Sequence, residues 1–310
     1  MKIFKKVFFA LQYQLKFRLN QRQKNLDIDN QAGLLVLNPV QTEIIVPKII
    51  WMYWEGKQSR LVQNCIANIK YLHPTYDVNI INSHNLNQFC DLDLSELTHI
   101  LPQHRADLIR LKLLYQHGGI WLDASIILYE SLDWIITLMK QEATQTFAYY
   151  RKKNTNNLKF PVVENWLMAS ASGNLFFKHW FDEFLIAIQQ QPKNYINEIK
   201  KNNRNSADIF QNIGNLEYLI AYIACQKMMR CYDASLCLIN CDQNAFYYQV
   251  KNKWTKEKIL IDLAINYKPS MPAKLIKLAR KERKYLEKYY DKQGYFSQSL
   301  LDFYPKQLMD

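Results

Sequence analysis

The block ADLIRLKLLYQHGGIWLDAS constrains the fold of this chain more than any other stretch. Its apolar spacing predicts a helix over 105–116, and the glycine pair that follows is typical of a helix C-terminus. The next residues, 120–122, predict a buried strand that ends at Asp123. Ligands bind outside the carboxyl ends of the strands in open α/β sheets. The junction therefore predicts a site around one acid.

Two further charged residues belong to this predicted site. Asp107 and Arg110 lie at positions i and i+3 of the expected helix, so their side chains share a face. The short glycine junction is expected to bring both close to Asp123, which a buried strand would hold rigidly. An acid and a guanidinium that point together suit sugar hydroxyls and a phosphate. A purely structural ion pair between Asp107 and Arg110 has the same spacing and is the alternative.

Strands and helices alternate over some 80 residues of the chain. A buried first strand is predicted at 46–54, a helix at 61–72 and a second strand at 76–81, followed by the helix and strand described above. This alternation indicates an α/β domain with a largely parallel sheet. Further predicted elements are a short helix at 85–89, strands at 147–150 and 162–169, and helices at 176–190 and 216–229.

The N-terminal 24 residues contain seven Lys or Arg and no acid. As a helix they place apolar side chains on one stripe and much of the charge outside it. The members of this stripe are Phe4, Val7, Phe8, Leu11, Leu15 and Leu19. Such a helix suits an anionic lipid surface, and docking on the protein's own core is an equal alternative. Its apolar run is too short to span a bilayer, and no A-x-A cleavage site follows.

Composition narrows the class of protein. The formal charge of +12 favours anionic partners such as nucleic acid, an acidic membrane or a phosphorylated small molecule. Six cysteines without a C-x-x-C pair are expected to be small core residues in a reducing cytosol, with a clustered disulfide set as the alternative. The chain contains no G-x-S-x-G, H-E-x-x-H or P-loop motif, which excludes the common hydrolases and P-loop enzymes.

The segments VPKIIWMYWEG, ADLIRLKLLYQHGGIWLDAS and ENWLMAS resemble the capsular polysaccharide synthesis glycosyltransferases. These belong with the DXD-containing sugar transferases, which include yeast-type mannosyltransferases and the large clostridial glucosylating toxins. The resemblance covers residues 46–175 and more faintly extends to about 265. It implies a GT-A fold: an α/β, Rossmann-like mixed sheet flanked by helices, here with helical N- and C-terminal extensions.

The resemblance also implies a division of the chain into three parts. Residues 1–45 would form a basic amphipathic segment and linker, with the linker at 25–46. Residues 46–265 would form the GT-A glycosyltransferase domain, and 266–310 a basic helical tail. Within this tail, 273–292 are predicted as one basic helix, for which a solvated face is the plainest interpretation. Attachment to an anionic membrane through 1–24, 273–292 or both is also expected.

Roles for individual residues follow from the same resemblance. Trp54 would stack on or border the base of a nucleotide-diphosphate sugar. Asp107 and Arg110 would contact the donor sugar as catalytic residues. Asp123 would be the third catalytic residue and the first acid of the DXD motif, at the ribose or sugar and the metal, and Ser125 would also lie in the donor site. On the acceptor side lie Glu164, Asn165 and Trp166, for which a hydrogen-bonded strand end is the alternative.

The family usually uses Mn²⁺ or Mg²⁺, and Ser125 departs from its pattern. The third motif position is normally an acid that touches the cation, and a hydroxyl is a weaker ligand for a hard divalent ion. In one interpretation Asp123, the diphosphate, water and a distant acid hold the metal, and Ser125 is at most a weak ligand. In the other, Lys and Arg side chains replace much of the charge of the metal. D-A-S endings look familiar in the capsular subgroup, so an active enzyme is expected.

The expected function is hexosyl or N-acetylhexosaminyl transfer, with retention of configuration, from a nucleotide-diphosphate sugar to a lipid-linked saccharide. The product would be a bacterial capsule, O-antigen or lipooligosaccharide, made on the cytoplasmic face of the inner membrane, with an anionic lipid surface as partner and no nucleic acid. One alternative is a basic non-catalytic protein that binds RNA or another polyanion. Another keeps the fold but performs a different nucleotide-sugar reaction, such as phosphosugar transfer.

Overall fold

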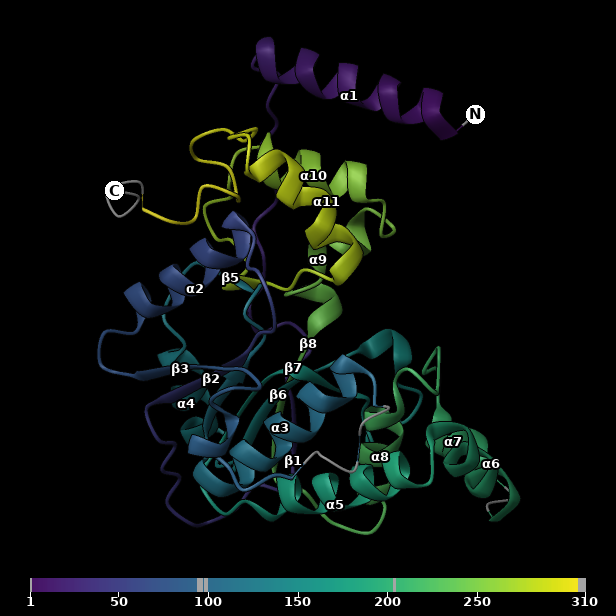
Figure 1. Ribbon diagram of the computed structural model, residues 1–310. Helices are drawn as coiled ribbons and strands as arrows, with labels where there is room; N and C mark the ends of the chain where they lie inside the picture. The colour runs from purple at the N-terminus through teal and green to yellow at the C-terminus, as the bar shows by residue number, and fades with distance from the viewer. Residues whose placement is uncertain (1, 94–96, 98–99, 203–204, 306–310) are drawn as a thin grey trace.

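The computed structural model describes residues 2–93, 97, 100–202 and 205–305, with side chains from residue 8 onward. Strands and helices alternate through most of this range (Figure 1). The strands are β1 Leu35–Leu37, β2 Ile49–Tyr53, β3 Asp77–Ile81, β4 Gly119–Leu122, β5 Ile127–Leu128, β6 Thr146–Tyr150, β7 Val163–Ser170, β8 Leu236–Asn240 and β9 Leu275–Ile276.

The helices lie mostly between these strands. The α-helices are α1 Lys2–Arg18, α2 Arg60–Leu72, α3 Pro102–His117, α4 Asp133–Gln141, α5 Leu175–Gln189, α6 Pro192–Asn202, α7 Ser206–Phe210, α8 Ile220–Met228, α9 Tyr247–Lys251, α10 Lys256–Ala264 and α11 Arg280–Tyr290. Short 3-10 helices occur at Leu86–Gln88, Lys152–Asn154 and Cys241–Gln243. The helices and strands predicted between residues 46 and 229 are confirmed within a few residues at each end.

Seven of the described strands form one mixed sheet, in the order β1-β8-β6-β7-β4-β2-β3. The pairs β2–β3, β2–β4 and β6–β8 are parallel, whereas β7 runs antiparallel to β4 and β6. Because β2 and β4 are parallel neighbours, the residues that follow them emerge at the same edge. The predicted mixed α/β sheet flanked by helices is confirmed.

The two faces of the sheet bury different side chains. Residues alternate between faces along a strand, so Trp121 packs among α3, α5 and α8 while Ile120 and Leu122 pack on the other side, where α2 and α4 lie. A third apolar cluster joins α9, α10 and α11 to Tyr13 of α1 and to Leu61 of α2. Figure 1 shows α1 lying across α10 and α11, on the side away from the sheet.

Two predicted segments differ from the structure. The stretch at 25–46, expected to be a linker, contributes β1, which pairs antiparallel with β8. The stretch at 273–292, expected to be one helix, starts as the strand β9, which pairs with β5, and becomes helical only at Arg280. In both segments the main chain finds strand partners that are distant in the sequence. All six cysteines are free, and five of them are buried, as expected for small core residues.

The glycine pair between α3 and β4 has backbone angles that few other residues adopt. Gly118 has φ +66° and Gly119 has φ +87°, in the region that favours glycine. An added Cβ at Gly119 would lie 2.6 Å from the carbonyl oxygen of Ile49, and one at Gly118 would lie 2.5 Å from the nitrogen of Ser172. The turn that places Asp123 after α3 therefore requires both glycines.

Replacing Gly119 by alanine should lower the free energy of unfolding by roughly 3 kcal/mol or more, because backbone strain adds to a clash with main-chain atoms. Gly173→Ala is the matched control: its φ is +74°, but nothing lies within 4 Å of an added Cβ. We expect it to cost only the conformational part, about 1 kcal/mol. Urea unfolding of both variants measures the difference, and equal losses would contradict the close approach to Ile49.

Candidate functional site

Asp123 lies directly after β4, at the edge where the neighbouring parallel strand β2 also ends. Its main-chain nitrogen donates to the carbonyl oxygen of Trp166 in β7 at 2.9 Å, so two strands fix its position. Its side chain is 28% exposed, which leaves one side open to a ligand. The structure thus places this acid at the sheet edge predicted from the sequence.

Arg110 connects the helix α3 to this acid. Its guanidinium lies 3.4 Å from Asp107 Oδ1 and 3.4 Å from Asp123 Oδ1. It also donates to the carbonyl oxygen of Asn165 at 2.6 Å, and it lies over the ring of Trp121, 4.8 Å from the centroid. The structure therefore brings Asp107, Arg110 and Asp123 together, and Arg110 bridges the two acids rather than pairing with one.

A second cation reaches Asp123 from the C-terminal part of the chain. Lys277 Nζ lies 2.5 Å from Asp123 Oδ2. Nearby, the guanidinium of Arg283 lies over the Trp54 ring, 4.7 Å from its centroid. Neither Lys277 nor Arg283 was expected in the site, because no spacing in the sequence relates them to residues more than 150 positions earlier.

The three residues expected on the acceptor side join the cluster through hydrogen bonds. Asn165 Nδ2 donates to Asp107 Oδ1 at 3.0 Å. Glu164 Oε2 accepts from the indole of Trp166 at 2.9 Å and from the hydroxyl of Tyr222 at 3.0 Å. Tyr222 also lies 3.3 Å from Asn165 Oδ1, which links the two parts of the network. Tyr222 is a further residue that sequence reasoning missed.

The remaining predicted residues, Trp54 and Ser125, flank Asp123. Trp54 follows β2, where its nitrogen donates to the carbonyl oxygen of Ile81 at 2.9 Å, and its ring packs under Arg283. Ser125 is 3% exposed, two residues after Asp123 in the turn that leads to β5. The roles assigned to both residues stay predictions.

The carboxyl groups of the site differ in the direction of their pKa shifts. Burial raises the pKa of Asp107 above its ordinary value, although Arg110 opposes the shift. Burial raises the pKa of Glu164 in the same way, against the nearby charge of Arg151. Burial also acts to raise the pKa of Asp123, but Lys277 and Arg110 outweigh it and hold the pKa below its ordinary value. Asp123 is therefore the most strongly anionic of the three.

The resemblance implies Mn²⁺ or Mg²⁺ at Asp123. Such ions take several oxygen ligands, with carboxylates prominent among them. In the described part of the chain, no group of three or more His, Cys, Asp or Glu is arranged to hold a metal. Asp123 has an ammonium 2.5 Å from one oxygen and a guanidinium 3.4 Å from the other. Each oxygen of Asp123 is therefore paired with a cationic side chain of the chain itself.

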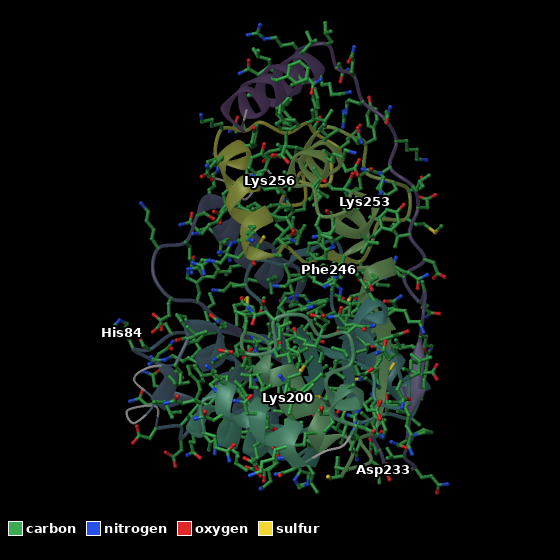
Figure 2. All side chains as sticks on the ribbon, turned by 90° about the vertical axis from the view of Figure 1, so that its right-hand side faces the viewer. His84, Lys200, Asp233, Phe246, Lys253 and Lys256 are labelled. Atoms are coloured by element: carbon green, nitrogen blue, oxygen red, sulfur yellow. The ribbon has the colours of Figure 1, made fainter. Side chains whose placement is uncertain are left out.

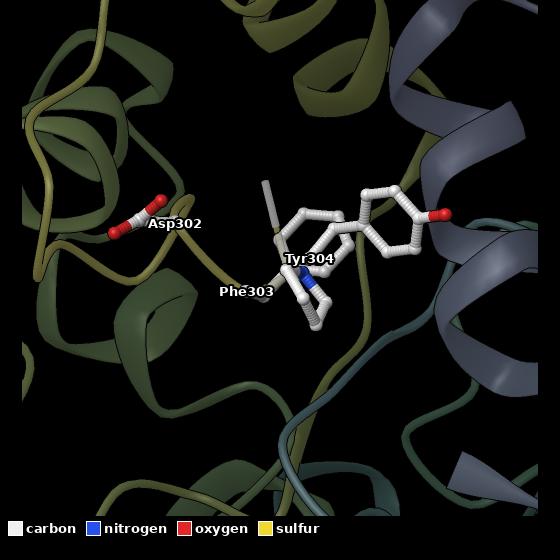
Figure 3. A pocket seen from close by; sticks show the side chains of 4 residues that line it. Asp302, Phe303 and Tyr304 are labelled. Atoms are coloured by element: carbon white, nitrogen blue, oxygen red, sulfur yellow. The ribbon is translucent and has the colours of Figure 1, made fainter. Parts of the chain in front are cut away.

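A separate surface pocket lies near the C-terminal end of the described chain. Its volume is about 350 Å³, and it is lined by Asp302, Phe303, Tyr304 and Pro305 (Figure 3). These four consecutive residues include none of the predicted site residues. The pocket is therefore distinct from the cluster around Asp123.

Residues 5–197 match the family described as capsular polysaccharide synthesis protein, and the chain belongs to that family. The match includes Trp54, Asp107, Arg110 and Asp123. It confirms the resemblance that the three sequence segments indicated. Lys277 and Arg283 lie beyond the matched residues.

Two fungal proteins are similar in sequence. Glycosyltransferase afumC of Aspergillus fumigatus is 27% identical over 177 residues, which are 51% of this chain and 44% of the relative. O-glycosyltransferase braB of Annulohypoxylon truncatum is 26% identical over 184 residues, 54% of this chain and 42% of the relative. The chain thus spans less than half the length of these curated relatives.

Solved glycosyltransferase structures are more distant. PaToxG glycosyltransferase has a TM-score of 0.34 and 10% identity, over 94% of this chain and 96% of that one. The galactosyltransferase LgtC, solved with donor and acceptor sugar analogues, has a TM-score of 0.38 and 9% identity, over 79% of this chain and 95% of that one.

Glu164→Gln should alter the pH dependence of stability. Because the folded pKa lies above the ordinary value of 4.5, the contribution of Glu164 is fully present below that value and is lost as pH rises through the folded pKa. Glutamine keeps an acceptor for Trp166 and Tyr222 but does not ionise. Relative to wild type, the variant should therefore gain free energy of unfolding, on the order of 1 kcal/mol, as pH rises.

Urea unfolding at a series of pH values from 4.5 upward measures this difference. Glu217→Gln is the matched control, since it removes the same charge from an exposed position. Parallel curves for Glu164→Gln and wild type would contradict a raised pKa at Glu164.

Proposed function

We propose that this protein is a glycosyltransferase that moves a sugar from a nucleotide-diphosphate donor to a lipid-linked saccharide during synthesis of a bacterial surface polysaccharide. The donor sugar would be a hexose or an N-acetylhexosamine, transferred with retention of configuration. The observation that carries the proposal is that Asp107, Arg110 and Asp123 meet at the carboxyl edge of the sheet, within the residues that match the family. The names of the two fungal relatives support transfer of a sugar.

The arrangement suits the charge changes of such a transfer. The bond between the anomeric carbon and the diphosphate breaks, and its electron pair remains on the phosphate oxygen. The acceptor hydroxyl oxygen forms the new bond, and its proton passes to the departing diphosphate. Catalysis then requires cations near that oxygen and alignment of the acceptor. Arg110 is held by two carboxylates and a carbonyl oxygen, so it is preorganised for this role.

For any nucleotide sugar that the wild-type protein hydrolyses, Asp123→Asn should lower the rate of hydrolysis by about 100-fold or more, because the substitution removes the charge that orients Arg110 and Lys277. The assay uses a panel of nucleotide-diphosphate sugars with the full chain. Asp233→Asn is the matched control, since Asp233 is exposed and lies at the opposite end of the molecule from α1 (Figure 2). No turnover with any donor, or equal rates for Asp123→Asn and wild type, would contradict the proposed site.

The same panel separates the alternatives. A basic protein that only binds RNA or another polyanion would turn over no donor. Phosphosugar transfer would release a nucleoside monophosphate instead of the diphosphate. The connected network of acids and guanidinium around Asp123 favours sugar transfer over a binding function, because a polyanion site gains nothing from buried carboxylates.

We also propose that α1 attaches the protein to an anionic membrane surface, at the cytoplasmic face of the inner membrane. One side of α1 packs on the protein: Phe9, Tyr13 and Phe17 contact aromatic rings of the C-terminal segment. The opposite side is an exposed apolar stripe. Its described members are Phe8, Leu11, Leu15 and Leu19, each more than half exposed.

The charges of this helix also suit a surface of anionic lipid. Lys16 and Arg18 lie in its last turn, and no acid is present in its first. The side chains of Phe4 and Val7, also expected on the stripe, lie outside the described residues. In the part of the chain that the structure covers, no helix is both long enough and apolar enough to cross a bilayer. The exposed apolar stripe, next to basic residues, supports an interfacial helix as the mode of attachment.

Leu11→Ser/Leu15→Ser should weaken binding to vesicles that contain phosphatidylglycerol by about tenfold or more, because each leucine loses burial in the interface. Sedimentation with vesicles measures the bound fraction. Leu26→Ser/Ile45→Ser is the matched control, since both residues are 65% exposed and lie outside α1. Equal binding of both double variants, or no binding of wild type at low salt, would contradict the proposal.

A further inference from the structure

The cationic side of the Asp123 site comes from a segment outside the family match. Lys277 follows β9, whose Ile276 lies opposite Ile127 of β5, four residues after Asp123. The nitrogen of Lys277 donates to the carbonyl oxygen of Ala245 at 3.1 Å, and its own carbonyl accepts from Gln249 Nε2 at 2.6 Å. The main chain of Lys277 is thus held on both sides.

The segment that accepts the Lys277 hydrogen bond at Ala245 is itself held by the neighbouring residue, Phe246. Phe246, labelled in Figure 2 where the C-terminal helices meet the sheet, packs on Trp166 at 5.6 Å and on Trp254 at 5.3 Å between ring centroids. The side chain of Lys277 is only 12% exposed. A lysine so confined keeps its ammonium close to Asp123, and it does so before any ligand arrives.

Arg283 extends the cationic surface from Asp123 toward Trp54. Its side chain is 18% exposed, its guanidinium lies on the Trp54 ring, and its Nε lies 3.3 Å from Glu287 Oε1. Asp123 is near enough for its charge to act on Arg283. Lys277 and Arg283 therefore lie between the acid expected at the donor sugar and the tryptophan expected at its base.

An anion fits this arrangement better than a metal ion does. A lysine ammonium has three donors, so one bond to Asp123 leaves two for phosphate oxygens. A divalent cation would instead have to displace that ammonium from an oxygen 2.5 Å away and accept a second cation, Arg110, near the other oxygen. The diphosphate of a nucleotide sugar has the chemistry that Lys and Arg side chains bind.

We propose that Lys277 and Arg283 bind the donor's diphosphate and supply the positive charge that a divalent metal would otherwise bring. Donor binding then requires no added metal ion. That the bound anion is the diphosphate of a sugar donor rests on the proposed function. The anion site itself rests on the geometry of Lys277, Arg283 and Asp123.

Calorimetric titration of the full chain with inorganic pyrophosphate, in excess EDTA, tests the site. Wild type should bind, and Mn²⁺ added in place of EDTA should not tighten binding. Lys277→Gln and Arg283→Gln should each weaken binding at least about tenfold, while Lys277→Arg keeps most of it. Lys281→Gln is the matched control, because it removes the same charge from an exposed position on α11. Melting temperatures show which variants are folded.

Two results would overturn the inference: binding by wild type only with Mn²⁺, or wild-type affinity in folded Lys277→Gln. The donor panel separates this failure from failure of the proposed function. Pyrophosphate binding that needs Lys277, without turnover of any nucleotide sugar, supports the anion site and contradicts the glycosyltransferase. Turnover that requires Mn²⁺ and is unchanged in Lys277→Gln supports the glycosyltransferase and contradicts the anion site.

Discussion

The ion pair between Asp123 and Lys277 couples the site to the fold of the whole chain. Removing a carboxylate from water costs several kcal/mol unless a counter-charge is positioned beside it. Arg110 is shared with Asp107, which has the greater burial, so Asp123 also needs Lys277. Lys277 reaches it only when β9 pairs with β5. The charged state of the site therefore requires the C-terminal segment to be folded against the sheet.

Local patterns account for what could be predicted. The elements β2, α2, β3, α3 and β4 follow from apolar spacing, and the contact between Asp107 and Arg110 follows from helix geometry. The position of Asp123 follows from the turn before β4. Two adjacent glycines in the sequence indicate this turn, because its positive φ angles favour glycine. Each of these signals lies within some twenty residues. The proximity of Asp107, Arg110 and Asp123 could therefore be predicted from local sequence alone.

Long-range pairings account for what was missed. The strands β5 and β9 have two residues each, too few to show any period, and β1 pairs only because β8 lies beside it. The family match ends at residue 197 and the resemblance at about 265, so neither could indicate Lys277 or Arg283. The sequence does raise the question that these residues address: Ser125 stands where a second acid is usual, and cations elsewhere in the chain could replace the metal.

The helix α11 shows how one basic segment serves two parts of the molecule. Residues four apart lie on the same face of a helix, so Arg283 and Glu287 form one side, toward Trp54 and Ser59. Tyr285 and Tyr289 form another, against the buried side of α1. Its lysines are left for solvent. The sequence of α11 is typical of a basic helix exposed to solvent. In the structure, one face of α11 supports the proposed donor site and another supports the proposed membrane helix, so both depend on the packing of α11.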